Sequence, residues 1–213
     1  PHLLLLWYVA FFALMAIAPF DRKIWLAANV LPLLFVSTLV LTHRAFRFSS
    51  LSYLLVTVWL TLHTVAVHYT YPKVPLGFWL EQWFDLHRNH FDRIVHFGFG
   101  FLLAYPLEEM FRRIAKPKGW VLPYLVVMTI LGFSAFWEIM EAWVGQIAHP
   151  DVEMALVGHQ GDIWDPQRDM SAALYGSLVC MAFVGLWRRG RESCMTFEPA
   201  APPAQSVLGE GSS

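Results

Sequence analysis

Charged residues and cysteine are both scarce in this sequence. Only 15% of the 213 residues are charged, whereas soluble globular domains carry about 25%, so the chain lacks the charge that a soluble surface needs. Its two cysteines, Cys180 and Cys194, exclude a disulfide scaffold and a zinc site built from cysteine. The formal net charge of −1 excludes a basic surface for nucleic acid, so we expect no nucleic-acid partner.

Apolar side chains, which make up 57% of the chain, are gathered into six long runs. A helix needs about 20 apolar residues to cross a membrane, and runs of about this length cover residues 3–19, 24–42, 51–71, 93–111, 120–146 and 166–187. The sequence therefore predicts an all-α, polytopic membrane protein, with a bundle of six transmembrane helices over residues 1–191. Residues 192–213 are rich in Pro, Ala, Gly and Ser, which predicts a disordered cytoplasmic tail.

The orientation of these helices follows from Lys and Arg, which accumulate in cytoplasmic loops. Residues 43–50, 112–119 and 188–191 carry more of these cations, less mixed with acids, than the opposite loops. Both termini are therefore predicted to be cytoplasmic. The first run ends in Ala-Ile-Ala at residues 16–18, like a signal peptide, but its length and the lack of a basic start favour a transmembrane helix.

An aromatic segment, FWLEQWF at residues 78–84, lies between the third and fourth runs. Its mixture of Trp and Phe with polar residues is typical of a short helix in the membrane interface. We expect such a helix here. It would anchor the protein as part of an aromatic belt, or cover a site as a lid or a guide for a lipid.

Acids and histidines gather at the outer, periplasmic ends of the predicted helices. Asp92 and His96 are four residues apart at the start of the fourth helix and share one face. Glu138 and Glu141, three residues apart, do the same in the fifth. Polar groups beside hydrocarbon are costly, so they mark a functional site by default. The third and sixth helices bring further polar residues to the same side: His68, Asp162, Asp165 and Asp169.

This cluster has the composition of a metal site. Imidazole with several carboxylates suits zinc, iron or manganese, whereas carboxylates alone suit magnesium or calcium. HExxH and paired ExxH motifs are absent, so the usual zinc-protease and di-iron patterns do not apply. The alternatives are a metal-free hydrogen-bonded network and, for one acid before Pro166, a helix cap. The candidate ligands are Asp92, His96, Glu138, Asp162, Asp165 and Asp169.

The same cluster supplies candidates for catalysis and substrate binding. Arg93 could hold an anionic head group bidentately or pair with Glu141, and Arg168 is a second cation beside the acids. His68 could supply another imidazole or be an interfacial group at a helix end. The candidates for acid–base catalysis are Asp92, His96, Glu138 and Glu141.

The cytoplasmic half offers little comparable chemistry. Glu108 and Glu109 are spaced from Arg112 and Arg113 for ion pairs one helical turn apart, which predicts a structural role. The remaining polar residues in the inner halves of the third to sixth helices are few and uncharged, namely Thr57, Thr129 and Ser177. This pattern indicates that the cytoplasmic half of the bundle is closed and apolar, and it disfavours a continuous polar path across the membrane.

Four sequence blocks resemble a known family. HYTYPKVPLGFW, RNHFDRIVHF, FWEIMEAW and GDIWDPQRDM are similar, in order and spacing, to the signature blocks of the YjdF-like family of bacterial inner-membrane proteins. The resemblance covers about residues 3–187 and implies a multi-pass protein of the bacterial inner membrane. The last two blocks also look like the VanZ-like family over the C-terminal third. Neither resemblance implies a particular activity.

Three functional hypotheses follow. The leading one is a membrane-embedded, metal-dependent enzyme whose periplasm-facing cluster acts on a lipid, an isoprenoid carrier or another amphiphile. The second is a transporter or channel that uses the same acids as a cation or proton site. The third is a non-catalytic membrane partner protein in which the cluster only joins helices. The bilayer itself is the one partner that all three require.

Overall fold

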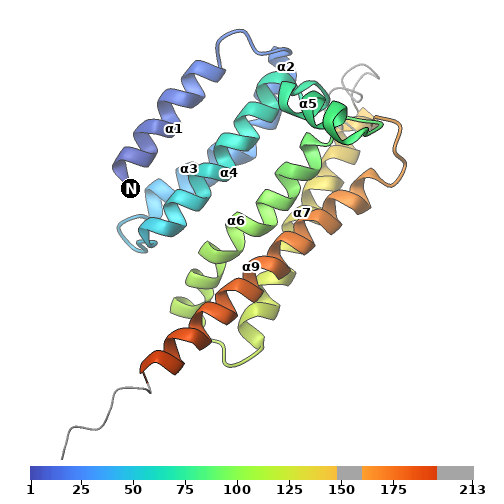
Figure 1. The fold of residues 1–213 in the computed structure, drawn as a ribbon. Coiled ribbons are helices and arrows are strands. Elements are labelled where there is room, and N and C mark those ends of the chain that lie inside the picture. Colours follow the sequence, from blue (N-terminus) through green and yellow to red (C-terminus); the bar gives the residue numbers. More distant parts are fainter. Residues whose placement is uncertain (148–159, 196–213) are drawn as a thin grey trace, which may run out of the picture.

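The computed structural model describes residues 1–147 and 160–195, and this part of the chain is helical throughout, without strands (Figure 1). The all-α prediction is therefore confirmed. The predicted tail lies outside the described residues from residue 196 onward. In chain order the helices are α1 (His2–Met15), α2 (Arg22–Ala28), α3 (Val30–Thr42), α4 (Ser50–Tyr69), the 3₁₀-helix η1 (Tyr71–Lys73), α5 (Pro75–Phe84), α6 (Phe91–Ile114), α7 (Val121–Ile147) and α9 (Asp165–Met195).

Four helical stretches are long and apolar enough to cross a membrane: residues 22–42, 50–69, 121–144 and 165–190. The structure thus supports a membrane-spanning protein with four of the six predicted spans. α1 is apolar but shorter. α6 is outside this set because it carries acids and arginines at both ends.

The second predicted span is divided at Asn29, where α2 ends and α3 begins. Asn29 Nδ2 donates to the carbonyl of Trp25 at 2.7 Å, so the side chain takes a carbonyl that a continuing helix would use. Pro32 has no N–H with which to bond the carbonyl four residues earlier. These two residues together explain a break that apolar composition alone does not reveal.

α6 is the central helix, and it packs against α4, α7 and α9. Its contact with α9 is backbone to backbone. A Cβ at Gly100 would lie 1.9 Å from the carbonyl oxygen of Ala173, and a Cβ at Gly176 would lie 2.3 Å from that of Phe97. Only glycine permits so close an approach. These two contacts set the register in which the polar ends of α6 and α9 meet.

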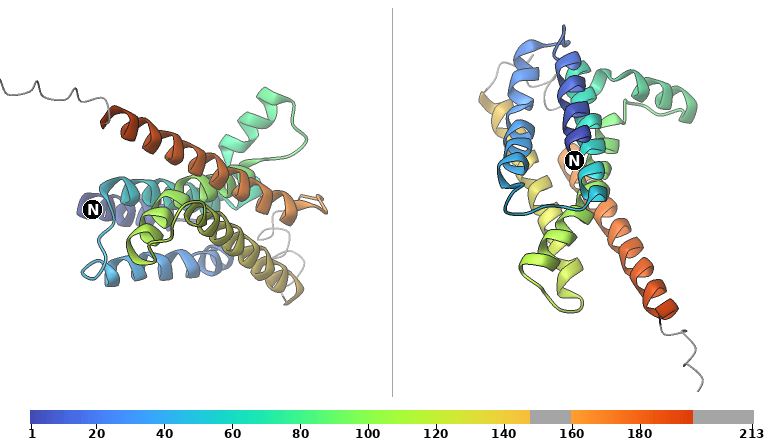
Figure 2. Two further views of the ribbon diagram at one scale, coloured as in Figure 1. Left: turned by 90° about the horizontal axis from the view of Figure 1, so that it is seen from below. Right: turned by 90° about the vertical axis from the view of Figure 1, so that its left-hand side faces the viewer.

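α5 stands out from the bundle, as the right-hand view of Figure 2 shows. The helix predicted from the aromatic segment therefore exists. It exposes large apolar side chains, among them Trp79, Trp83 and Phe84, and it ends at Asp85 in the left-handed conformation. Membrane-interface helices commonly carry such a surface.

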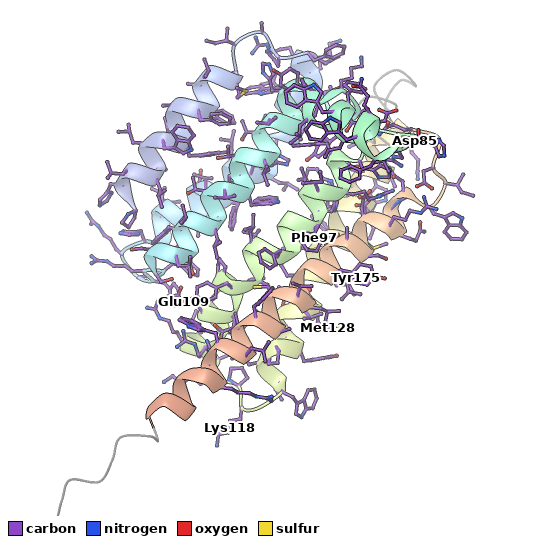
Figure 3. All side chains as sticks on the ribbon, in the orientation of Figure 1. Asp85, Phe97, Glu109, Lys118, Met128 and Tyr175 are labelled. Atoms are coloured by element: carbon purple, nitrogen blue, oxygen red, sulfur yellow. The ribbon has the colours of Figure 1, made fainter. Side chains whose placement is uncertain are left out.

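The end of α6 that carries Glu108 and Glu109 is closed by ion pairs and hydrogen bonds. Glu108 lies 3.4 Å from Arg112 and 2.5 Å from Arg188 of α9. Glu109 lies 2.9 Å from Arg113 and accepts hydrogen bonds from the start of α4, the Ser49 N–H and the Ser52 hydroxyl. The predicted ion pairs are therefore confirmed. Figure 3 shows Glu109 and Asp85 at opposite ends of the molecule.

Candidate metal centre at one end of the bundle

Three helices bring buried polar side chains together at the other end of the bundle. Asp92 and His96 occupy the first two turns of α6, Asp169 lies in the second turn of α9, and Glu138 lies two thirds of the way along α7. All four are buried, with at most 8% of each residue exposed. Charged groups removed from water need partners of opposite charge or a metal.

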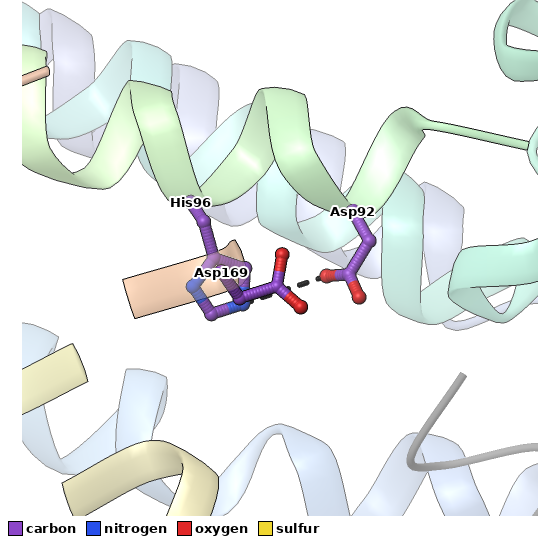
Figure 4. A group of neighbouring side chains, drawn as sticks. All are labelled: Asp92, His96 and Asp169. Atoms are coloured by element: carbon purple, nitrogen blue, oxygen red, sulfur yellow. Dashed lines mark ion pairs between the residues drawn. The ribbon is translucent and has the colours of Figure 1, made fainter. Parts of the chain in front are cut away.

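Asp92, His96 and Asp169 form a compact group of donor atoms. One ligand atom from each lies within 4.8 Å of the other two, and Figure 4 shows the three side chains turned toward one another. His96 Nε2 lies 3.5 Å from Oδ1 of Asp92. The i,i+4 spacing predicted this pair, whereas the third member comes from a different helix.

Glu138 joins the group from α7. Its Oε1 atom lies 3.7 Å from His96 Nε2. This oxygen is buried and has no hydrogen-bond partner among residues 1–147 and 160–195. A buried acceptor without a hydrogen bond lowers the stability of the folded protein by about 1–3 kcal/mol, and by more when it is charged. A cation bound here would remove that cost.

The distances between these atoms are longer than those of hydrogen bonds. Neither 3.5 nor 3.7 Å is a good hydrogen-bond distance, which is about 2.7–3.2 Å. Two ligands bound to a tetrahedral ion at about 2.0–2.1 Å are about 3.3 Å apart. Among the described residues, Asp92, His96 and Asp169 are the three whose ligand atoms all lie close enough to one another to hold one ion.

Arg93 neutralises the acids of α9. Its guanidinium contacts the carboxylates of Asp165 and Asp169, lies 3.2 Å from Asp162, and donates to the Asp165 carbonyl at 3.0 Å. These are the acids that Arg93 contacts, and Glu141 accepts a hydrogen bond of 2.6 Å from Trp137 Nε1. Since Arg93 holds one side of Asp169, it orients that carboxylate beside His96.

Asp162 and Asp165 form an arginine-paired group next to the three donor residues. Arg88 Nη1 lies 2.6 Å from Asp165 and 3.4 Å from Asp162. Arg168, whose side chain is 60% exposed, lies 2.7 Å from Asp162. The structure therefore places both acids, predicted as metal ligands, against arginines. Asp165 also opens α9, where a negative charge is favourable.

The pKa of the Asp162 carboxyl lies below its ordinary value of 3.8. Partial loss of hydration raises this pKa. The backbone N–H of Trp164 and the guanidinium groups of Arg168, Arg93 and Arg88 lower it by more. The carboxylate is therefore ionised at neutral pH, as its ion pairs require.

The arginines leave part of the cluster without a cationic partner. They contact Asp162, Asp165 and Asp169. Asp92 and Glu138 instead lie 3.5 and 3.7 Å from His96 Nε2, and Glu141 accepts a hydrogen bond from Trp137 Nε1. Buried like charges repel one another strongly, so a proton or a cation bound at these acids would stabilise the cluster.

His68 lies outside this cluster. Its Nδ1 atom is 2.8 Å from the carbonyl oxygen of Met15, so it joins the end of α4 to the end of α1. His63, which faces another direction on α4, is buried between the rings of Trp59 and Trp137 and bonds Tyr71 at 2.8 Å. The structure thus gives both histidines packing partners.

Sequence reasoning assigned no role to Asn89 and Gln160, which join the loop before α6 to the loop before α9. Asn89 and Gln160 exchange hydrogen bonds, from Asn89 N to Gln160 Oε1 at 3.1 Å and from Gln160 Nε2 to Asn89 O at 3.0 Å. Asn89 also donates to the Val74 carbonyl and accepts from the Phe91 N–H. The side-chain oxygen of Asn89 lies so close to Gly77 that a Cβ added at Gly77 would be 1.7 Å from it. In the sequence, the only sign of this contact was the run of polar residues before α6.

Comparison with known proteins agrees with this architecture. The family described as "Predicted membrane protein (DUF2238)" matches residues 1–190. The chain is 32% identical over 169 residues, 79% of its length and 80% of the relative's, to the inner membrane protein YjdF of Escherichia coli strain K12. No solved structure matches. The YjdF-like resemblance is confirmed, whereas the VanZ-like resemblance is not shown by these matches.

Proposed function

This chain belongs to the DUF2238 family of predicted membrane proteins, and on that premise we propose that it holds a divalent metal ion between α6, α7 and α9. The proposed ligands are Asp92, His96, Asp169 and Glu138. The observation that carries the proposal is the grouping of three buried donor atoms within 4.8 Å. The unpartnered Oε1 atom of Glu138, which faces His96, supports it independently.

The donor set favours a transition metal. One imidazole with carboxylates suits zinc, iron or manganese, whereas magnesium and calcium prefer oxygen throughout. His96 would bind through Nε2, the atom that faces Asp92 and Glu138. Arg93 would hold the Asp169 carboxylate from its far side, as outer partners of metal ligands commonly do.

The proposed activity is metal-dependent chemistry on a lipid, an isoprenoid carrier or another amphiphile. A bound metal of this kind activates water or polarises a substrate oxygen. Glu141 lies one turn from Glu138, and Trp137 orients it through the hydrogen bond to its carboxylate, so it would carry a proton to or from the substrate. Arg168 is exposed at the edge of the cluster and would meet an anionic head group.

The proposed topology has six crossings of the bacterial inner membrane, made by α1, by α2 with α3, by α4, by α6, by α7 and by α9. The basic loops lie at the Glu109 end of the bundle, so that end would be cytoplasmic by the positive-inside rule. Both termini would then be cytoplasmic, and the candidate metal centre would face the periplasm.

Elemental analysis of the detergent-purified protein tests the site directly. The wild type, purified without chelator, is compared with Glu138→Gln, His96→Ala and Asp85→Asn. Asp85→Asn is the matched control, because it removes an exposed acid outside the cluster and asparagine tolerates the left-handed conformation. We expect about one transition-metal ion per chain in the wild type and control, and a loss of at least tenfold in the other two variants.

The alternatives predict different results in the same experiment. A transporter or channel that uses the acids for protons, and a partner protein in which they only join helices, would both contain no stoichiometric metal. Metal retained unchanged in Glu138→Gln and His96→Ala would also contradict the proposed site. A stoichiometric protein partner in a pulldown from the membrane would then favour the structural role.

A further inference from the structure

A second feature lies at the opposite end of the bundle and takes no part in the proposed metal site. Helices α1, α3 and α4 line a half-open cavity of about 270 Å³. Its walls are almost entirely apolar and include Leu5, Tyr8, Val36, Leu39, Val56 and Leu60. The volume is close to the lower end of the range of about 300–1,000 Å³ that small-ligand pockets occupy.

The helices around this cavity face hydrocarbon on their outer sides. Leu6 of α1 is 66% exposed and Leu34 of α3 is 58% exposed, which suits lipid contact in a chain that spans a membrane. Apolar cavities of this size do not hold water well and take apolar ligands. In a bilayer the abundant apolar ligand is an acyl chain, so the cavity is suited to one.

The rim of the cavity is polar and basic. It is lined by His2, His43, Arg44 and Tyr53, and by no acid. His43 Nδ1 lies 2.8 Å from the Tyr53 hydroxyl, and the rings of His43 and His2 are 6.0 Å apart. Arg44 is exposed and forms no ion pair or hydrogen bond through its side chain with the described residues. A phosphate at this rim would meet a guanidinium that no carboxylate of residues 1–147 or 160–195 neutralises.

We propose that this cavity is a binding site for one anionic phospholipid, with an acyl chain between α1, α3 and α4 and its phosphate at Arg44 and His43. The rim lies on the loop between α3 and α4. This loop leads into the start of α4, where the Ser49 N–H donates a hydrogen bond to Glu109. A lipid bound there has its head group at the same level as the basic loops. The site is independent of the metal centre, so either proposal can fail without the other.

The test is native mass spectrometry of protein purified from nanodiscs that contain phosphatidylglycerol as a minor lipid in phosphatidylcholine. We expect the wild type to retain one phosphatidylglycerol after detergent washing that removes annular lipid. Leu39→Trp fills the cavity and should abolish retention. Leu34→Trp adds the same ring to the exposed side of α3 and should leave retention unchanged.

The head-group contact is tested by Arg44→Gln, a surface change that leaves the packing of the helices intact. It should lower the ratio of retained phosphatidylglycerol to phosphatidylcholine about fivefold, the effect of one basic residue near a membrane surface. Arg47→Gln is the matched control, since Arg47 is an exposed residue of the same loop that does not line the cavity. Equal retention in the wild type and Leu39→Trp, or an unchanged ratio in Arg44→Gln, would overturn the proposal.

Discussion

His96 of α6 and Glu138 of α7 face each other across a buried interface, with 3.7 Å between Nε2 and Oε1. Arginines contact Asp162, Asp165 and Asp169 at this end of the bundle, whereas the polar neighbour of Glu138 is His96. A cation bound beside this pair would give the buried Oε1 atom of Glu138 a partner, which it does not have among the described residues.

Metal should raise the thermal stability of the wild-type protein. A ligand at about one hundred times its Kd stabilises the folded state by about 2.7 kcal/mol, so zinc or manganese added to chelator-treated protein should raise Tm by several degrees. His96→Ala should lose this response, because it removes the nitrogen donor. The measurement is a thermal melt in detergent with and without metal, and an identical response in both proteins would refute the assignment of His96.

Acid should weaken the arginine-paired group through Asp162. Since the pKa of this carboxyl is lower in the folded protein than its ordinary value, its stabilisation is fully present above about pH 4 and is lost as the pH falls through the folded value. Asp162→Asn should therefore flatten the acid limb of a plot of Tm against pH. The control is Asp85→Asn, whose acid limb should match that of the wild type.

The contact between α6 and α9 should tolerate no added side chain at Gly100. A Cβ there would overlap the Ala173 carbonyl, so Gly100→Ala should destabilise the fold by about 1–3 kcal/mol. Gly132→Ala has nothing within 4 Å of the added Cβ and should instead gain about 0.5–1 kcal/mol from helix propensity. Melting curves that shift in the same direction for both variants would contradict this account of the contact.

Removal of the Glu109 carboxylate should destabilise the end of the bundle that lies opposite the candidate metal centre. Glu109→Ala leaves the Ser49 N–H and the Ser52 hydroxyl without their acceptor, at a cost of about 1–3 kcal/mol. Glu109→Gln keeps a carbonyl oxygen in the same place and should lose less. Chemical denaturation of the wild type and both variants measures the order of their stabilities. If Glu109→Gln destabilises the protein as much as Glu109→Ala, the charge of the carboxylate matters more than its role as a hydrogen-bond acceptor.

Local patterns predicted the features that depend on one helix. Asp92 and His96 share a face because they are four residues apart, and the ion pairs of Glu108 and Glu109 with Arg112 and Arg113 follow from the same spacing. The helical content and most membrane spans follow from the apolar runs. The division of the second run at Asn29 was missed, because one side-chain hydrogen bond decides it.

The sequence alone determined an all-α membrane protein with polar groups at one end, because helix formation and burial in lipid depend on residues close along the chain. Only the tertiary structure decided which of those groups meet. Gly100 and Gly176 bring α6 against α9, and this packing sets Asp169 beside His96 while Asp162 and Asp165 face arginines. The rotation of each helix about its axis depends on such contacts between distant residues, which spacing along one helix does not contain.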